Sequence, residues 1–156
     1  MTWTTFHRRG EVLRTVTATV DERRDGLVPM DVPGVRETFG DELSVLAALQ
    51  LRWHTRLSGR LERALLHQPV DIDDAVIGAW HATAAELPGT RLVLDHYRAE
   101  PLDAAMADAL RTAAAKEHVL LAAMAGQSTA DAAVTAAVGR ELEERARATY
   151  RSPVAA

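Results

Sequence analysis

The chain has 156 residues and a net charge of −4, with 47% hydrophobic residues, 4% aromatic residues and no cysteine. This length suits one ordinary domain that buries its core without disulfides or a structural metal. The absence of cysteine excludes disulfides, thiolate chemistry and cysteine-ligated zinc. We therefore expect a single helical-bundle domain over residues 1–150 and a frayed tail over 151–156.

The composition favours helices that approach one another closely. Alanine, the strongest helix former, fills 29 of the 156 positions. No run of 18 apolar residues is present, so we expect a soluble, cytoplasmic protein that does not enter a membrane. Lys116 is the single lysine among 18 basic residues, a bias that indicates a GC-rich bacterial genome.

The first 40 residues predict one helix and a long connection. Residues 4–25 carry apolar side chains at helical spacing, including Phe6, Val16 and Val20. Residues 26–40 contain three glycines and two prolines, which predicts a packed connection with one helical turn around residues 35–39.

The strongest helical pattern covers residues 41–68. Asp41 is a suitable N-cap, and Gln68 ends the helix because the residue before a proline is pushed out of the α region. The apolar residues fall on one stripe that must be buried: Leu43, Leu46, Trp53, Leu57, Leu61, Ala64 and Leu65.

Three further helices are expected after residue 70. Asp71 caps one that continues past Pro88 with a kink, or that is divided there into two helices. Another runs from Pro101 to Gly126 with Leu102 on its stripe, and the last runs over 129–150. Its buried face should hold Val134, Val138 and Leu142. The sequence therefore predicts an all-α fold, an antiparallel up-and-down bundle of four main helices plus a fifth C-terminal helix.

Polar side chains on these stripes are the candidate ligand-binding residues, namely Gln50, His54, Arg91 and Glu117. A buried polar group needs a partner, so one interpretation is structural: Glu117 pairs with Arg91 or with Arg9, and Gln50 and His54 satisfy each other.

Two interpretations make these residues a binding site. One is a metal site built from His54 and Glu117, with Asp95, His96 or His118, although the chain has no Glu-x-x-His or His-Glu-x-x-His pair. The other is a clamp of Arg9 and Arg91 around a small anion. The preferred interpretation includes no metal and no cofactor.

The remaining histidines, among them His81 and His118, fall away from the stripes and should lie on the solvated surface. No serine stands in a Gly-x-Ser-x-Gly elbow, and no glycine-rich phosphate loop is present. Catalytic residues are therefore not identified, and whether the protein is an enzyme stays open.

A stripe of arginines faces away from the leucines of residues 41–68: Arg52, Arg56, Arg60 and Arg63. A basic stripe can bind phosphates, but the acidic net charge makes nucleic acid an unfavoured partner. We expect solvated or intramolecular pairing, or a contact with the acidic residues Glu141, Glu143 and Glu144 of a second subunit.

These patterns favour a self-associating, non-enzymatic interaction protein, a homodimer in the simplest case. The alternative is a helical bundle that binds a small anion or a metal at a polar site inside its core.

Overall fold

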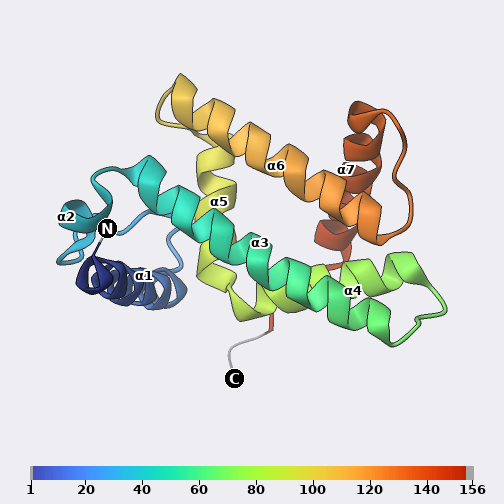
Figure 1. Cartoon of the computed structure of the whole chain (residues 1–156), viewed down its shortest axis with the longest axis horizontal. Coiled ribbons are helices and arrows are strands. Elements are labelled where there is room, and N and C mark those ends of the chain that lie inside the picture. The colour runs from blue at the N-terminus through green and yellow to red at the C-terminus, as the bar shows by residue number, and fades with distance from the viewer. Residues whose placement is uncertain (1, 154–156) are drawn as a thin grey trace. The chain divides into compact units, whose positions relative to one another are not determined.

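The structure is a computed structural model that describes residues 2–153. Within these residues the chain forms seven α-helices and no strand (Figure 1). The all-α prediction is therefore confirmed. The helices are α1 (Trp3–Arg23), α2 (Val35–Phe39), α3 (Glu42–Leu66), α4 (Ile72–Glu86), α5 (Pro88–Ala99), α6 (Ala104–Met124) and α7 (Ala132–Thr149).

The chain divides into two compact units. The first unit comprises Met1–Trp53 and Leu87–Ala107, and the second comprises His54–Glu86 and Asp108–Ala156. Helix α3 contributes to both, because the division falls between Trp53 and His54. The single domain over residues 1–150 stays a prediction. Residues 151–153 of the expected tail are not helical, and the rest of that tail lies outside the described residues.

Several predicted helix ends are confirmed. The Asp41 carboxylate accepts from the Ser44 N–H at 2.8 Å, and Asp71 accepts from the Asp74 N–H at 2.9 Å. Hydrogen bonds from Ser44, first from its side chain and then from its backbone, hold the pKa of the Asp41 carboxyl below its usual value. The helical turn expected around residues 35–39 is α2.

Other ends differ from the prediction. Helix α1 ends at Arg23, where Arg24 takes the left-handed conformation with φ of 48°. Helix α6 begins at Ala104 and not at Pro101, because Asp103 caps it by accepting from the Met106 N–H at 2.8 Å. Leu102 is consequently 62% exposed and does not belong to the buried stripe.

The region around Pro88 forms two helices, which was the alternative to a single kinked helix. Leu87 has φ of −123° and ψ of 56°, outside the helical region, and Pro88 opens α5. Proline suits the first turn of a helix, because the N–H that it lacks has no intrahelical acceptor there.

In the first unit, α1 packs against both α5 and α2 (Figure 1). Gly89 of α5 lies on the backbone of α1: a β-carbon at this position would be 2.2 Å from the carbonyl oxygen of Val20. The Asp21 carboxylate also accepts from the Gly89 N–H at 2.9 Å. Helix α5 therefore meets α1 through backbone, without an intervening side chain.

In the second unit, α4 packs against α7, and α7 also meets α6 through a glycine. A β-carbon on Gly139 would lie 1.7 Å from the carbonyl oxygen of His118. This contact sets which face of α7 is buried: Thr135, Gly139, Leu142, Glu143 and Ala146.

The predicted stripe of α3 is confirmed in its middle, since Leu46, Trp53, Leu57 and Leu61 are fully buried. Its end members Leu43, Ala64 and Leu65 are only partly buried. Two predictions on other helices are wrong. Phe6 is 67% exposed, because it lies near the start of α1, and Val134 is 48% exposed, because α7 packs through its glycine face.

No helix among the described residues is long and apolar enough to span a bilayer.

Replacing Gly139 by alanine should lower the free energy of unfolding by about 2–3 kcal/mol, because the new methyl group overlaps the backbone of α6. Urea unfolding of the variant measures this change. Gly59→Ala is the matched control: its β-carbon meets nothing within 4 Å, so stability should stay or rise by up to about 1 kcal/mol. Equal stabilities for the two variants would contradict the close approach.

Candidate functional site

The four candidate ligand-binding residues are divided between the two units. Gln50 and Arg91 lie in the first unit, and His54 and Glu117 lie in the second. Glu117 is fully buried, as the stripe of residues 101–126 predicts. A site that unites all four residues stays a prediction.

Arg91 is held inside the first unit by neighbours on either side of its guanidinium. The guanidinium carbon lies 4.5 Å from the centre of the Trp53 ring, and Nη2 lies 2.8 Å from the Asp95 carboxylate. The side chain is 7% exposed. Stacking on Trp53 and pairing with Asp95 thus restrict Arg91, which disfavours its use as a mobile clamp.

Two members of the arginine stripe, Arg56 and Arg60, are paired within the chain with a carboxylate of α4. Glu86 of α4 receives Arg60 Nη2 at 2.5 Å and Arg56 Nε at 3.4 Å. Within one chain neither Arg56 nor Arg60 pairs with the acidic residues of the last helix, and the contact with a second subunit stays a prediction. Arg63 forms no ion pair with any residue in 2–153.

The prediction that His81 and His118 are solvated surface residues is wrong. His118 Nε2 is hydrogen-bonded to the carboxylate of Glu143, and His81 Nε2 lies 2.7 Å from the carbonyl oxygen of Ala146. The small residues of α7 allow the neighbouring helices to come close enough to half-bury both imidazoles.

Glu143 is the centre of a polar cluster in the second unit. Its side chain is 6% exposed, and its Oε1 accepts from Arg147 Nε at 2.9 Å and from Nη2 at 2.6 Å. The Arg147 guanidinium in turn lies 5.2 Å from the centre of the Trp80 ring. Both Glu143 oxygens thus accept from protein groups, which marks the cluster as an internal brace between α6 and α7.

The residues predicted for a metal site do not form a cluster of metal-binding side chains. Among residues 2–153 no group of three or more His, Cys, Asp or Glu side chains is arranged to hold a metal ion. The one described partner of the His118 ring is Glu143 of α7, and neither His54 nor Asp95 shares that contact.

A groove of about 350 Å³ runs between the C-terminal half of α3 and α4, and we name it the α3–α4 groove. It is lined by small residues and by cationic or titratable side chains. The lining residues are Arg60, Arg63, Ala64, His67, Ala75, Gly78, Ala79 and Ala82. Three large apolar side chains are exposed where α3 connects to α4: Leu66 at the end of α3, Val70 in the loop and Ile72 at the start of α4, at 79%, 107% and 43%.

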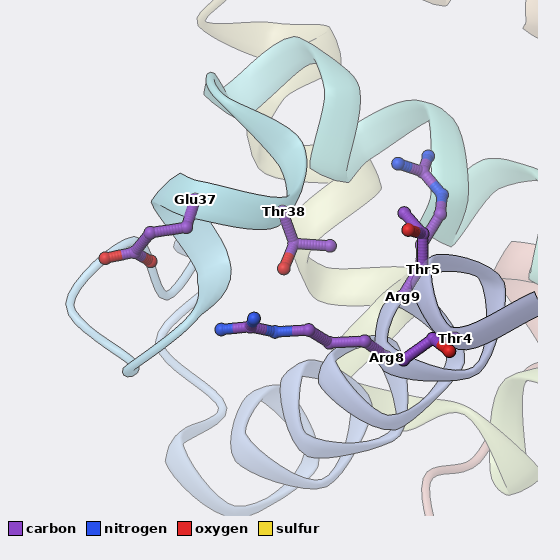
Figure 2. Close-up of a pocket in the computed structure, with 6 residues that line it drawn as sticks. All are labelled: Thr4, Thr5, Arg8, Arg9, Glu37 and Thr38. Atoms are coloured by element: carbon purple, nitrogen blue, oxygen red, sulfur yellow. The ribbon is translucent and has the colours of Figure 1, made fainter. Parts of the chain in front are cut away.

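A second concave region, which we name the α1–α2 pocket, has a volume of about 330 Å³ and lies in the first unit (Figure 2). It is lined by Thr4, Thr5, Arg8 and Arg9 of α1 and by Glu37 and Thr38 of α2. The expected clamp of Arg9 and Arg91 is not found here, because Arg91 does not line this pocket.

Figure 2 shows how the polar groups of this pocket are directed. Arg8 reaches from α1 toward α2 and passes close to Thr38 in this view, and Arg9 leaves the same helix in another direction. The carboxylate of Glu37 points away from both arginines.

Comparison with protein-family models, with curated protein sequences and with solved structures gives no match to this chain.

Glu143→Gln should lower the free energy of unfolding by about 2 kcal/mol, because it removes the charge that holds Arg147 and His118. Thermal unfolding by circular dichroism measures this loss. Glu62→Gln is the control: Glu62 is exposed, so its replacement should change stability by less than about 0.5 kcal/mol. An unchanged midpoint for Glu143→Gln would show that the cluster does not brace α7.

Proposed function

We propose that this protein is a non-enzymatic interaction protein that self-associates, with α7 of one copy docked in the α3–α4 groove of another. The observation that supports this most directly is the match in charge and side-chain size between the groove and the outer face of α7.

The groove is suited to a helix. It is lined by alanines and Gly78, which allow a second backbone to come close. Arg63, free of ion pairs within residues 2–153, also lines it, as does His67. The apolar side chains where α3 connects to α4, with Val70 fully exposed, add surface that is stabilised by leaving water.

The outer face of α7 has the complementary pattern. Its exposed residues recur at three- and four-residue steps, which puts them on one stripe: Val134, Ala137, Glu141, Glu144 and Ala148. Glu141 and Glu144 form no ion pair with a described residue. A helix that presents apolar and small residues with two carboxylates fits a small-residue groove that carries an arginine and a histidine.

Both surfaces belong to the second unit, so two copies related by a twofold axis can exchange the same contact twice. Each copy then donates one α7 stripe and accepts another, which is the self-complementary arrangement of most homodimers. This assignment modifies the dimer contact predicted from sequence: Glu141 and Glu144 serve it, whereas Glu143 braces its own chain.

The remaining expectations from sequence are kept as proposals of the same kind. They are an antiparallel up-and-down arrangement of four main helices with a fifth, a bacterial origin and a cytoplasmic location. None of them is needed for the groove and stripe to meet.

A second candidate function is ligand binding at a polar interior site around Gln50, His54, Arg91 and Glu117. It is favoured by one observation, the complete burial of the Glu117 carboxyl group, because buried ionisable groups are frequent at binding sites. A native mass spectrum that shows an extra stoichiometric mass, lost in Glu117→Ala, would support this candidate.

Arg63→Glu should convert the dimer to monomer, with the dissociation constant raised by about tenfold or more, because it places like charges across the contact. Glu144→Arg should have the same effect, and the two changes together should recover part of the affinity. Sedimentation velocity over a concentration series measures the monomer fraction.

Two controls separate docking from general charge effects. Lys116→Glu makes the same change of charge on exposed α6 and should leave the dimer intact. Gly78→Leu, whose β-carbon meets nothing within 4 Å, should fill the groove and release monomers while the fold is kept. A wild-type protein that is monomeric at every concentration would refute the proposal.

A further inference from the structure

We infer that the α1–α2 pocket binds the phosphate group of a small phosphate monoester, with Arg8 and Arg9 as the cationic ligands. This inference does not depend on self-association, because the pocket belongs to the first unit and the α3–α4 groove to the second.

The spacing of α1 arranges the donors of the pocket on two adjacent faces of the helix. Thr4 and Arg8 are four residues apart, as are Thr5 and Arg9, so each pair lies one turn apart on the same face. Thr38 of α2 contributes a hydroxyl from the opposite wall. A ligand between the two helices would therefore meet hydrogen-bond donors from two directions.

The arginines of the pocket are not used by the fold as ion-pair partners. Arg8 and Arg9 form no ion pair with a residue in 2–153, whereas Arg23, Arg60 and Arg145 elsewhere each pair with a carboxylate at 2.8 Å or less. The hydroxyls of Thr4 and Thr38 likewise have no hydrogen-bond partner among these residues.

The local charge is positive. Two guanidinium groups and one carboxylate, that of Glu37, line the pocket, and Glu37 forms no ion pair with either arginine. The first turn of α1 contains no acidic residue that would neutralise the positive end of the helix dipole. The two arginines therefore attract an anion that enters the pocket, and Glu37 is the one carboxylate of the pocket that repels it.

Arg9 is positioned before any ligand arrives. Its guanidinium carbon lies 4.5 Å from the centre of the Phe39 ring, and Phe39 is buried. Stacking on a fixed ring restricts the side chain, so less conformational entropy is lost when it binds an anion. Arg8 is exposed and would close over the ligand from the solvent side.

The donor set suits phosphate better than carboxylate. Two guanidinium forks and the Thr4 and Thr38 hydroxyls can donate from several directions, and a tetrahedral phosphate offers three terminal oxygens. The volume of about 330 Å³ exceeds that of a bare phosphate and lies at the lower end of small-molecule sites. A phosphate ester of a small organic group therefore suits both the donor set and the volume of the pocket.

The test is titration of the whole protein with phenyl phosphate, followed by NMR or calorimetry. We expect a dissociation constant of about 1 mM or lower. Arg8→Gln and Arg9→Gln should each raise it by about tenfold, since each removes a charge-assisted hydrogen bond.

Two matched variants make the test specific to the pocket. Glu37→Gln should lower the dissociation constant by several-fold, because it removes the one carboxylate that opposes the anion. Arg14→Gln, an exposed change on the same helix outside the pocket, should leave it unchanged.

Three outcomes would overturn the proposal. The first is no saturable binding of phenyl phosphate. The second is equal weakening by Arg8→Gln and by Arg14→Gln, which would indicate a general effect of charge. The third is binding to phosphatidic acid vesicles without any binding of phenyl phosphate, which would assign the arginines to a lipid surface.

Discussion

The fold depends on helices that meet through backbone at glycine. Gly89 lies on the carbonyl of Val20 in the first unit, and Gly139 lies on the carbonyl of His118 in the second. The chain has few aromatic side chains to fill space between helices, and alanine is its commonest residue. With such small side chains, the helices must approach one another closely for the interior to reach the packing density of other proteins.

Close approach also explains the buried polar groups. When α7 comes to within backbone contact of α6, Glu143 and His118 are drawn into the contact, and a buried carboxylate must be paired. Arg147 supplies the second partner one turn away on α7 and covers Trp80. The polar cluster is thus a consequence of the glycine contact, and it fixes the rotation of α7 about its own axis.

Sequence periodicity predicted the parts of the fold that depend on a single helix. The α3 stripe, the caps at Asp41 and Asp71 and the burial of Glu117 all follow from spacing along the chain. The buried face of α7 was predicted only in part: Leu142 is buried, but Val134 is exposed and Val138 is only partly buried. The glycine contact with α6 turns Gly139 and its neighbours inward.

The candidate site was predicted less well, for a related physical reason. Arg9 of the expected clamp lines the α1–α2 pocket, but its neighbour there is the adjacent Arg8, whereas Arg91 contacts Trp53 and Asp95. Periodicity along one helix does not give the tertiary neighbours of a long side chain. The signal within the sequence was the adjacent pair Arg8 and Arg9, which follows a first turn of α1 that lacks acidic residues.

Charge pairing within the described residues separates arginines that support the fold from those that can serve a partner. The chain has 22 acidic and 18 basic residues, so carboxylates are in excess. Arg8, Arg9 and Arg63 nevertheless form no ion pair within residues 2–153, and each lines a concave surface. Exposed Arg14 and Arg140 are also without ion pairs there, but they line neither the α1–α2 pocket nor the α3–α4 groove. An unpaired cation at a concave surface can hold an anion from more than one direction, which a cation on a convex surface does not do. Arginines that lack an ion pair and also line a concave surface thus mark the two surfaces to which we assign partners. The α3–α4 groove is suited to carboxylates on a helix, and the α1–α2 pocket is suited to a phosphate.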